Sequence, residues 1–206
     1  MKKIINLNLR FIYSATIILG CLNAQLQVGD ISPDFEAVVC DNGEDVNPDY
    51  VNGDTWSLHD EGAGKVTWIN LFTSWWPSCQ TEAPLTEVIW QEFLSENEDY
   101  LNIVAIGFDW NQPYSCAAWA NQFGISYPML SDVENNMEAW NLFGDGYIPH
   151  NVVLDHNHEV LFTSSGYPES QIINAIELGL SYVPRDHDND GVMDSTDNCF
   201  STPNPE

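Results

Sequence analysis

The chain has 206 residues, of which 44% are hydrophobic and 12% aromatic, which is enough for one packed domain with short appendages. Five Lys and Arg residues stand against 31 Asp and Glu residues, for a formal net charge of -26. Such a surface repels nucleic acid and anionic membranes and attracts divalent cations, so we exclude nucleic-acid binding.

The N-terminus predicts an export signal. Residues 1–10 are basic, and residues 11–19 form an apolar run too short to span a membrane. Cleavage after Ala24 is favoured over a lipobox-like site at residues 18–21, in which Cys21 would carry a lipid anchor. We therefore expect residues 1–24 to be removed and the protein to lie in the periplasm, at the cell surface or outside the cell, with no membrane span. The remainder keeps only Lys65 and Arg185 against 31 acidic residues, a balance of -29.

The pattern of apolar residues after the signal alternates between strand and helix. Strands are expected at 35–39, 66–72, 102–108, 127–130, 151–154 and 159–162, and helices at 79–97, 115–123, 133–143 and 168–180. Residues 41–54 read as an irregular acidic loop. This order predicts an α/β domain over residues 25–183, with a mixed sheet flanked by helices and a right-handed crossover between the two central strands. Residues 184–206 form a polar, acidic tail that cannot build a core.

Residues 72–84 combine the end of a buried strand, a tight turn and the start of a helix at Cys79. A helix N-terminus carries partial positive charge and free backbone N–H groups, which stabilise a thiolate. The turn is therefore a candidate redox site.

This segment resembles the active-site turn of exported thioredoxin-fold thiol–disulfide oxidoreductases, including those of the cytochrome-maturation type. Their Trp-Cys-Pro-x-Cys pattern, followed by Glu and Pro, is matched by Trp75, Pro77, Cys79, Glu82 and Pro84. Residues 146–150 resemble the family's cis-proline loop, which implies that Pro149 faces the turn. The resemblance covers roughly residues 27–181. It implies a thioredoxin-like fold, and protein or small-molecule thiols and disulfides as partners, with no organic cofactor.

The departure from the family lies at Trp76, which occupies the position of the first, nucleophilic cysteine. Tryptophan cannot form a mixed disulfide, so exchange between two cysteines inside the motif is excluded. The leading hypothesis is exchange by Cys79 with Cys116 as a distal partner, in which Trp75 and Pro149 shape the contact surface and Glu82 tunes the thiol.

Two alternatives stay open. One is a catalytically degenerate binding module that uses the exposed surface of Trp75, Trp76 and Pro149. The other is a peroxiredoxin-like peroxidase, which the absence of any Arg between Gln25 and Pro184 disfavours, since those enzymes use an arginine beside the thiolate.

Four cysteines follow the predicted signal, and three full pairings are possible. They are Cys40, Cys79, Cys116 and Cys199. A permanent Cys40–Cys116 disulfide beside a buried, inert Cys79 is the structural alternative to a reversible Cys79–Cys116 bridge.

The tail carries regularly spaced acids that match the ligand spacing of a calcium loop. Counted from the first acid, ligands fall at positions 1, 3, 5, 7, 9 and 12, which are Asp186, Asp188, Asp190, the Val192 carbonyl, Asp194 and Asp197. With Cys199 and the prolines that follow, the segment resembles a thrombospondin type 3 repeat. The resemblance implies that residues 184–206 bind Ca²⁺.

Three histidines, His150, His156 and His158, lie near the cis-proline loop and the predicted hairpin. No cysteine or histidine spacing supports a structural zinc site, and we expect these to be surface loop residues.

Overall fold

A computed structural model describes residues 25–45, 48–97, 99–134, 136–186, 192–194, 196–199 and 201–203. The predicted signal peptide, residues 1–24, lies outside the described residues, and so do Asp188 and Asp190 of the predicted calcium loop.

The protein is built on one seven-stranded mixed sheet. Its strands are β1 (Glu36–Asp41), β2 (Thr55–Ser57), β3 (Val66–Thr73), β4 (Leu101–Phe108), β5 (Met129–Ser131), β6 (His150–Leu154) and β7 (Val160–Ser165). They lie in the order β2-β1-β5-β4-β3-β6-β7. The neighbours β3, β4 and β5 are parallel, and every other pairing is antiparallel. This is the predicted thioredoxin-like α/β arrangement.

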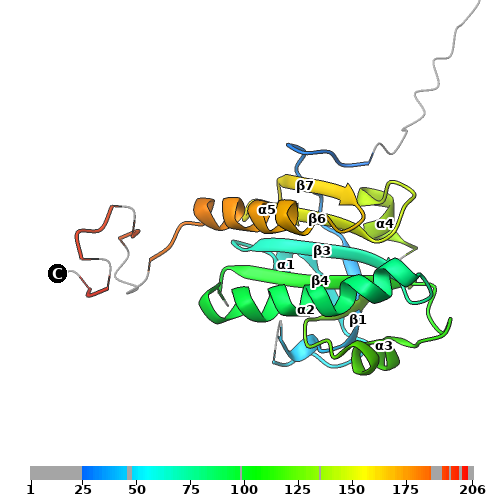
Figure 1. Ribbon diagram of the computed structural model, residues 1–206. Coiled ribbons are helices and arrows are strands. Elements are labelled where there is room, and N and C mark those ends of the chain that lie inside the picture. The colour runs from blue at the N-terminus through cyan, green and yellow to red at the C-terminus, as the bar shows by residue number, and fades with distance from the viewer. Residues whose placement is uncertain are drawn as a thin grey trace, which may run out of the picture.

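Helices cover both faces of the sheet (Figure 1). They are α1 (Leu58–Glu61), α2 (Pro77–Asn97), α3 (Cys116–Phe123), α4 (Glu138–Phe143) and α5 (Glu169–Tyr182), with a short 3-10 turn at Gly43–Asp45. None of the helices in the described part of the chain is long and apolar enough to cross a membrane.

The buried strands divide their side chains between two cores, because successive residues of a strand point to opposite faces. In β3, Trp68 and Phe72 pack with α2, α3 and α5, while Ile69 and Leu71 join the core that contains residues of α1 and α4. Both faces are thus apolar, which explains why the central strands read as continuous hydrophobic runs.

Helix α3 begins and ends as predicted. The hydroxyl of Ser115 accepts a hydrogen bond from the backbone N–H of Ala118 at 3.3 Å, and Gly124 ends the helix with φ 67°. Such a left-handed residue is the common way to end a helix, and glycine adopts it without steric cost.

Helix α4 is shorter than the predicted 133–143. Asn136 and Met137 have φ values of 57° and 61°, which are incompatible with a right-handed helix. The buried Asp132 carboxylate accepts hydrogen bonds from the backbone N–H groups of Ala139 and Trp140, at 3.2 and 2.9 Å. The helix therefore begins at Glu138, where these donors find their partner. The short elements β2 and α1 lie where the sequence predicts no strand or helix.

Candidate functional site

The candidate site lies at one end of the sheet, where β3 passes into α2. Thr73 is the last residue of β3, and α2 begins at Pro77. On the neighbouring strand, His150 pairs with Leu71, which places Pro149 opposite the next residue of β3. The Ile148–Pro149 bond is cis, as the resemblance to the oxidoreductase family implies. The turn and the proline loop therefore lie at the same end of the sheet.

Two tryptophans form the outer surface of the turn. Trp75 and Trp76 are 43% and 40% exposed, and their ring centroids lie 5.6 Å apart at an interplanar angle of 80°. Tyr147, in the proline loop, is 71% exposed. Three large aromatic side chains are thus left in contact with water at this end of the sheet.

Cys79, in the first turn of α2, is only 2% exposed. Burial raises the pKa of its thiol to about 12, and the Glu82 carboxylate adds to this effect, while backbone hydrogen bonds at Thr73 and at Cys79 itself act in the opposite direction. Loss of hydration therefore opposes the stabilisation of the thiolate that the sequence suggests for a helix N-terminus.

Glu82, one turn after Cys79, is buried to the same extent and belongs to a polar cluster inside the domain. Its Oε1 accepts hydrogen bonds from Nδ2 of Asn70 at 2.6 Å and from Nδ2 of Asn151 at 2.8 Å. Its Oε2 has no hydrogen-bond partner. Burial raises the pKa of the Glu82 carboxyl to about 8, although the hydrogen bond from Asn151 acts to lower it. This carboxyl can accept or release a proton near neutral pH.

Sequence reasoning missed the two asparagines that hold Glu82. Asn70 lies in β3 and Asn151 in β6, and they pair directly across the two strands. The side-chain oxygen Oδ1 of Asn151 also accepts a hydrogen bond from Nε1 of Trp68 at 2.8 Å. Asn70 interrupts the apolar run of a buried strand, and Asn151 directly precedes the apolar residues of β6. A polar residue inside a buried strand needs a buried partner, and this is the pattern from which they could have been found.

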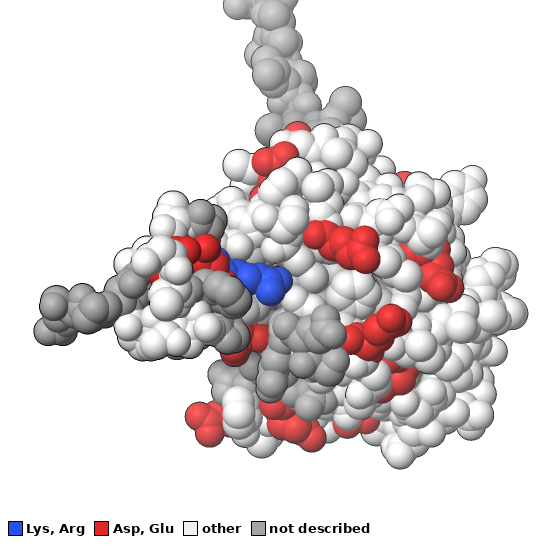
Figure 2. Space-filling model, turned by 60° about the vertical axis from the view of Figure 1, so that its left-hand side comes forward, with Lys and Arg blue, Asp and Glu red and all other residues white. Residues whose placement is uncertain are grey.

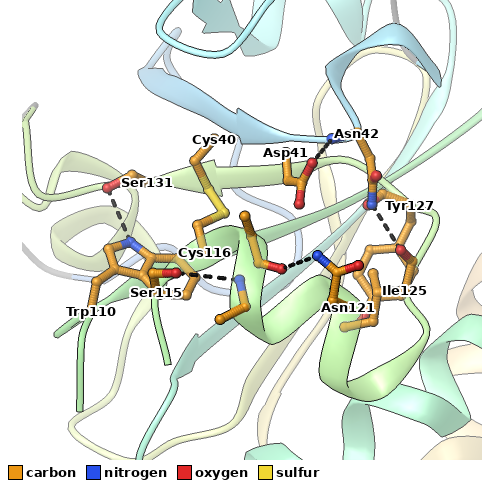
Figure 3. The surroundings of a disulfide bond; sticks show 12 residues. Cys40, Asp41, Asn42, Trp110, Ser115, Cys116, Asn121, Ile125, Tyr127 and Ser131 are labelled. Carbon is orange, nitrogen blue, oxygen red and sulfur yellow. Dashed lines mark hydrogen bonds between the residues drawn. A yellow bond between two sulfur atoms is a disulfide. The ribbon is translucent and has the colours of Figure 1, made fainter. Parts of the chain in front are cut away.

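The expected Cys79–Cys116 bridge is not formed. Cys116, the first residue of α3, is joined to Cys40 of β1, with a Cα–Cα separation of 6.0 Å (Figure 3). Cys79 and Cys199 are free, the first buried and the second exposed. The alternative pairing considered from the sequence is therefore the one observed, and Cys116 is not available to Cys79 while this bond exists.

Hydrogen bonds near the disulfide stabilise the same part of the domain. Nδ2 of Asn42 donates to the carbonyl oxygens of Ile125 and Tyr127, at 2.9 and 3.2 Å (Figure 3). The disulfide and these bonds together tie the β1 region to the segment that contains α3.

The expectation of surface histidines is wrong for His150, which is 2% exposed. Its Nε2 lies 2.9 Å from the Thr163 hydroxyl, and its Nδ1 lies 3.3 Å from Oδ1 of Asp145. Burial lowers the pKa of His150 and so favours the neutral ring, despite the nearby Asp145.

The two basic side chains of the described residues lie far from Cys79. Lys65 directly precedes β3, whose other end leads into the site, and β3 spans roughly 23 Å between its first and last residues. Arg185 donates to Oδ1 of Asn97 at 3.0 Å and lies over the ring of Tyr100, just before β4 begins. Acidic side chains are spread over the visible surface, with a basic area beside the C-terminal segment (Figure 2). No described basic residue can therefore stabilise a thiolate or a bound peroxide at Cys79.

Four of the six predicted calcium ligands are described. Asp194 donates its backbone N–H to the carbonyl oxygen of Arg185 at 2.7 Å, and Oδ1 of Asp197 accepts from the backbone N–H of Cys199 at 2.9 Å. Asp186 and Val192 complete the described set. Among the described residues no three His, Cys, Asp or Glu side chains are grouped to hold a metal ion.

The sheet order, the helix that follows β3 and the cis-proline loop define a thioredoxin-like protein. A family model for the AhpC/TSA family matches residues 28–163, and the chain belongs to that family. No protein of curated function matches the sequence.

Solved structures resemble the chain in fold, all at low identity. A candidate protein disulfide isomerase from Bacteroides thetaiotaomicron has a TM-score of 0.60 and 21% identity, over 77% of this chain and 91% of that chain. A thioredoxin-family thiol:disulfide interchange protein from Chlorobium tepidum TLS has a TM-score of 0.57 and 21% identity, over 76% and 99%. The thioredoxin domain of a thiol-disulfide oxidoreductase from Bacteroides vulgatus has a TM-score of 0.56 and 15% identity, over 77% and 99%.

Proposed function

We propose that this protein binds an extended polypeptide segment at the surface formed by Trp75, Trp76 and Tyr147, without two-cysteine exchange. Pro149 was expected to share this surface but is itself buried, and it is the neighbouring Tyr147 of the cis-proline loop that is exposed. The observation that carries the proposal is the exposed Trp76 at the nucleophile's position, beside a Cys79 that solvent does not reach. Exposed tryptophans are the side chains that contribute most to binding energy at protein interfaces.

A pocket beside the turn supports a peptide ligand. It has a volume of about 240 Å³ and is lined by Ser78, Thr81, Glu82, Leu85 and Tyr167. Leu85 is 41% exposed, so the lining continues the apolar surface of the turn. Such a pocket offers room for one side chain of a bound segment, while the tryptophans contact the residues next to it.

Calorimetry with a reduced and alkylated unfolded protein tests this proposal, because the alkylated ligand has no thiol to exchange. We expect saturable binding that the double substitution Trp75→Ala/Trp76→Ala abolishes. Leu178→Ala is the matched control, since Leu178 is 45% exposed and lies on α5. Equal binding by all three proteins, or no binding by the unaltered protein, would refute the proposal.

The second candidate function is thiol–disulfide exchange by Cys79 alone, and the buried Glu82 favours it. Glu82 is ionised above its pKa of about 8, and its carboxylate, one turn from Cys79, can then act as the base that takes the thiol proton. The thiolate would attack one sulfur of a partner disulfide, form a mixed disulfide with it and release the other sulfur as a thiolate. This route needs an opening of the turn. Mass spectrometry after incubation with glutathione disulfide would show one glutathione on Cys79 if exchange takes place.

The Cys40–Cys116 disulfide supports the proposed export, since such bonds persist in oxidising compartments. Export as such is tested by sequencing the N-terminus of protein recovered from cells, which we expect to begin at Gln25.

We also propose that the tail binds Ca²⁺ through the five aspartates and the Val192 carbonyl. Support comes from the ligand spacing, since calcium prefers six to eight oxygen ligands. We expect heat of binding on titration with millimolar CaCl₂, and its loss in Asp186→Asn/Asp190→Asn. A flat titration of the unaltered protein would remove this assignment.

A further inference from the structure

The formal charges at the site end of the sheet are negative. Asp109 follows β4, Asp145 precedes β6 and Glu169 begins α5, and all three are exposed. Because β4 ends, β6 begins and β7 leads to α5 at this same end, the three carboxylates lie around the turn that carries the tryptophans. The basic residues Lys65 and Arg185 lie at the opposite end, as described above.

The tryptophan pair exposes indole surface to solvent. The two rings are nearly perpendicular and both are about two-fifths exposed, so they present indole faces in two directions. Indole is the best aromatic partner for an ammonium or guanidinium group, which it attracts through its electron-rich face. Carboxylates nearby strengthen the preference for positive charge over a neutral or negative group.

We infer that the segment bound at this surface is cationic and places a lysine or arginine side chain against Trp75 and Trp76. The inference rests on the proposed function and gives its ligand a chemical class. Trp76 then takes part in ligand recognition itself, in addition to replacing the cysteine that related proteins have at this position.

The test compares three decapeptides in which serine alternates with lysine, glutamine or glutamate, measured by calorimetry at low and at physiological salt. The lysine peptide should bind at least ten-fold more tightly than the glutamate peptide at low salt. Trp76→Ala should weaken its binding by about two- to five-fold, the size of a surface cation–π contact.

A pair of charge-matched double variants separates a local site from general attraction to an acidic protein. Asp109→Asn/Glu169→Gln removes two carboxylates at the site, and asparagine tolerates the positive φ of 58° found at Asp109. Asp99→Asn/Glu177→Gln removes two exposed carboxylates from other parts of the surface. Charges more than about 8 Å away are screened at physiological salt, so only the first variant should weaken binding there.

The outcomes are distinct. Equal binding of all three peptides would overturn the inference and leave the proposed function standing. Equal weakening by the two double variants would also overturn it, because the attraction would then be general. Absence of binding by every peptide, together with a failed unfolded-protein titration, would refute the proposed function itself.

Discussion

The side-chain amide of Asn151 donates a hydrogen bond to Oε1 of Glu82 at 2.8 Å, and so joins β6, which follows the cis-proline loop, to the helix that carries Cys79. Asn70 donates to the same oxygen from β3. Two neutral donors cannot fully replace the water that a carboxylate loses on burial, and the pKa of Glu82 is therefore raised.

The raised pKa of Glu82 predicts a pH-dependent stability. The folded protein holds this proton up to about pH 8, whereas the unfolded chain releases it near the ordinary value of 4.5. Between these two pH values the folded state binds more protons, so the free energy of unfolding falls as pH rises. Relative to Glu82→Gln, the decline should reach about 1.4 kcal/mol per pH unit.

Urea unfolding of both proteins between pH 5 and pH 8 measures this difference. Comparing the two variants cancels the repulsion among the other acidic residues, which both share. A constant difference across the range would show that Glu82 is ionised throughout and that its surroundings solvate it well.

Supplying the cysteine that the motif lacks should raise the thiol–disulfide exchange activity. Trp76→Cys completes the Trp-Cys-Pro-Ser-Cys spacing, and the new thiol would occupy a position that is 40% exposed before the start of α2. Such a thiol has a lowered pKa and can pass a disulfide to Cys79. We expect insulin reduction with dithiothreitol to rise at least ten-fold over the unaltered protein.

Trp75→Cys is the control for spacing, because it adds a thiol one residue too early. Similar rates for both variants would mean that any exposed thiol suffices. A high rate in the unaltered protein would mean that the present site already performs exchange.

The Cys40–Cys116 disulfide should act on stability rather than on binding at the site. It joins residues 76 apart in the sequence, and a closed loop of that length is worth about 4 kcal/mol in the chain-entropy account. The double substitution Cys40→Ala/Cys116→Ala should lower the free energy of unfolding by this order, whereas Cys199→Ser should leave it unchanged. If the folded double variant no longer bound the polypeptide, the disulfide would be required for binding at the site.

Most of the fold could be predicted because its strands are long and apolar and its helices have clear ends. Residues 66–72 and 102–108 are continuous buried runs, and Ser115 and Gly124 bound α3 by their own chemistry. The start of α4 could not be predicted, since Asp132 captures the helix donors from outside the helical pattern.

The place of the candidate site in the fold could be predicted from the sequence, but the chemical state of its cysteines could not. The turn follows from the local sequence, whereas cis-Pro149 and the place of Glu82 in the motif follow from the resemblance to the oxidoreductases. For Cys79 the sequence leaves two alternatives, a reactive and a buried thiol, because its burial depends on the packing of the core that it joins. The pairing of Cys116 likewise depends on how β1 lies against α3, which no local pattern contains.

Alkylation of Cys79 in the folded Cys199→Ser protein tests the central claim most directly. With a pKa of about 12, roughly one thiol in 10⁴ is ionised at pH 8, and the side chain is buried. We predict that iodoacetamide modifies Cys79 only as fast as the protein unfolds, as followed by mass spectrometry. Rapid modification of the native protein, at the rate of an exposed thiol, would contradict the account and assign Cys79 to exchange chemistry.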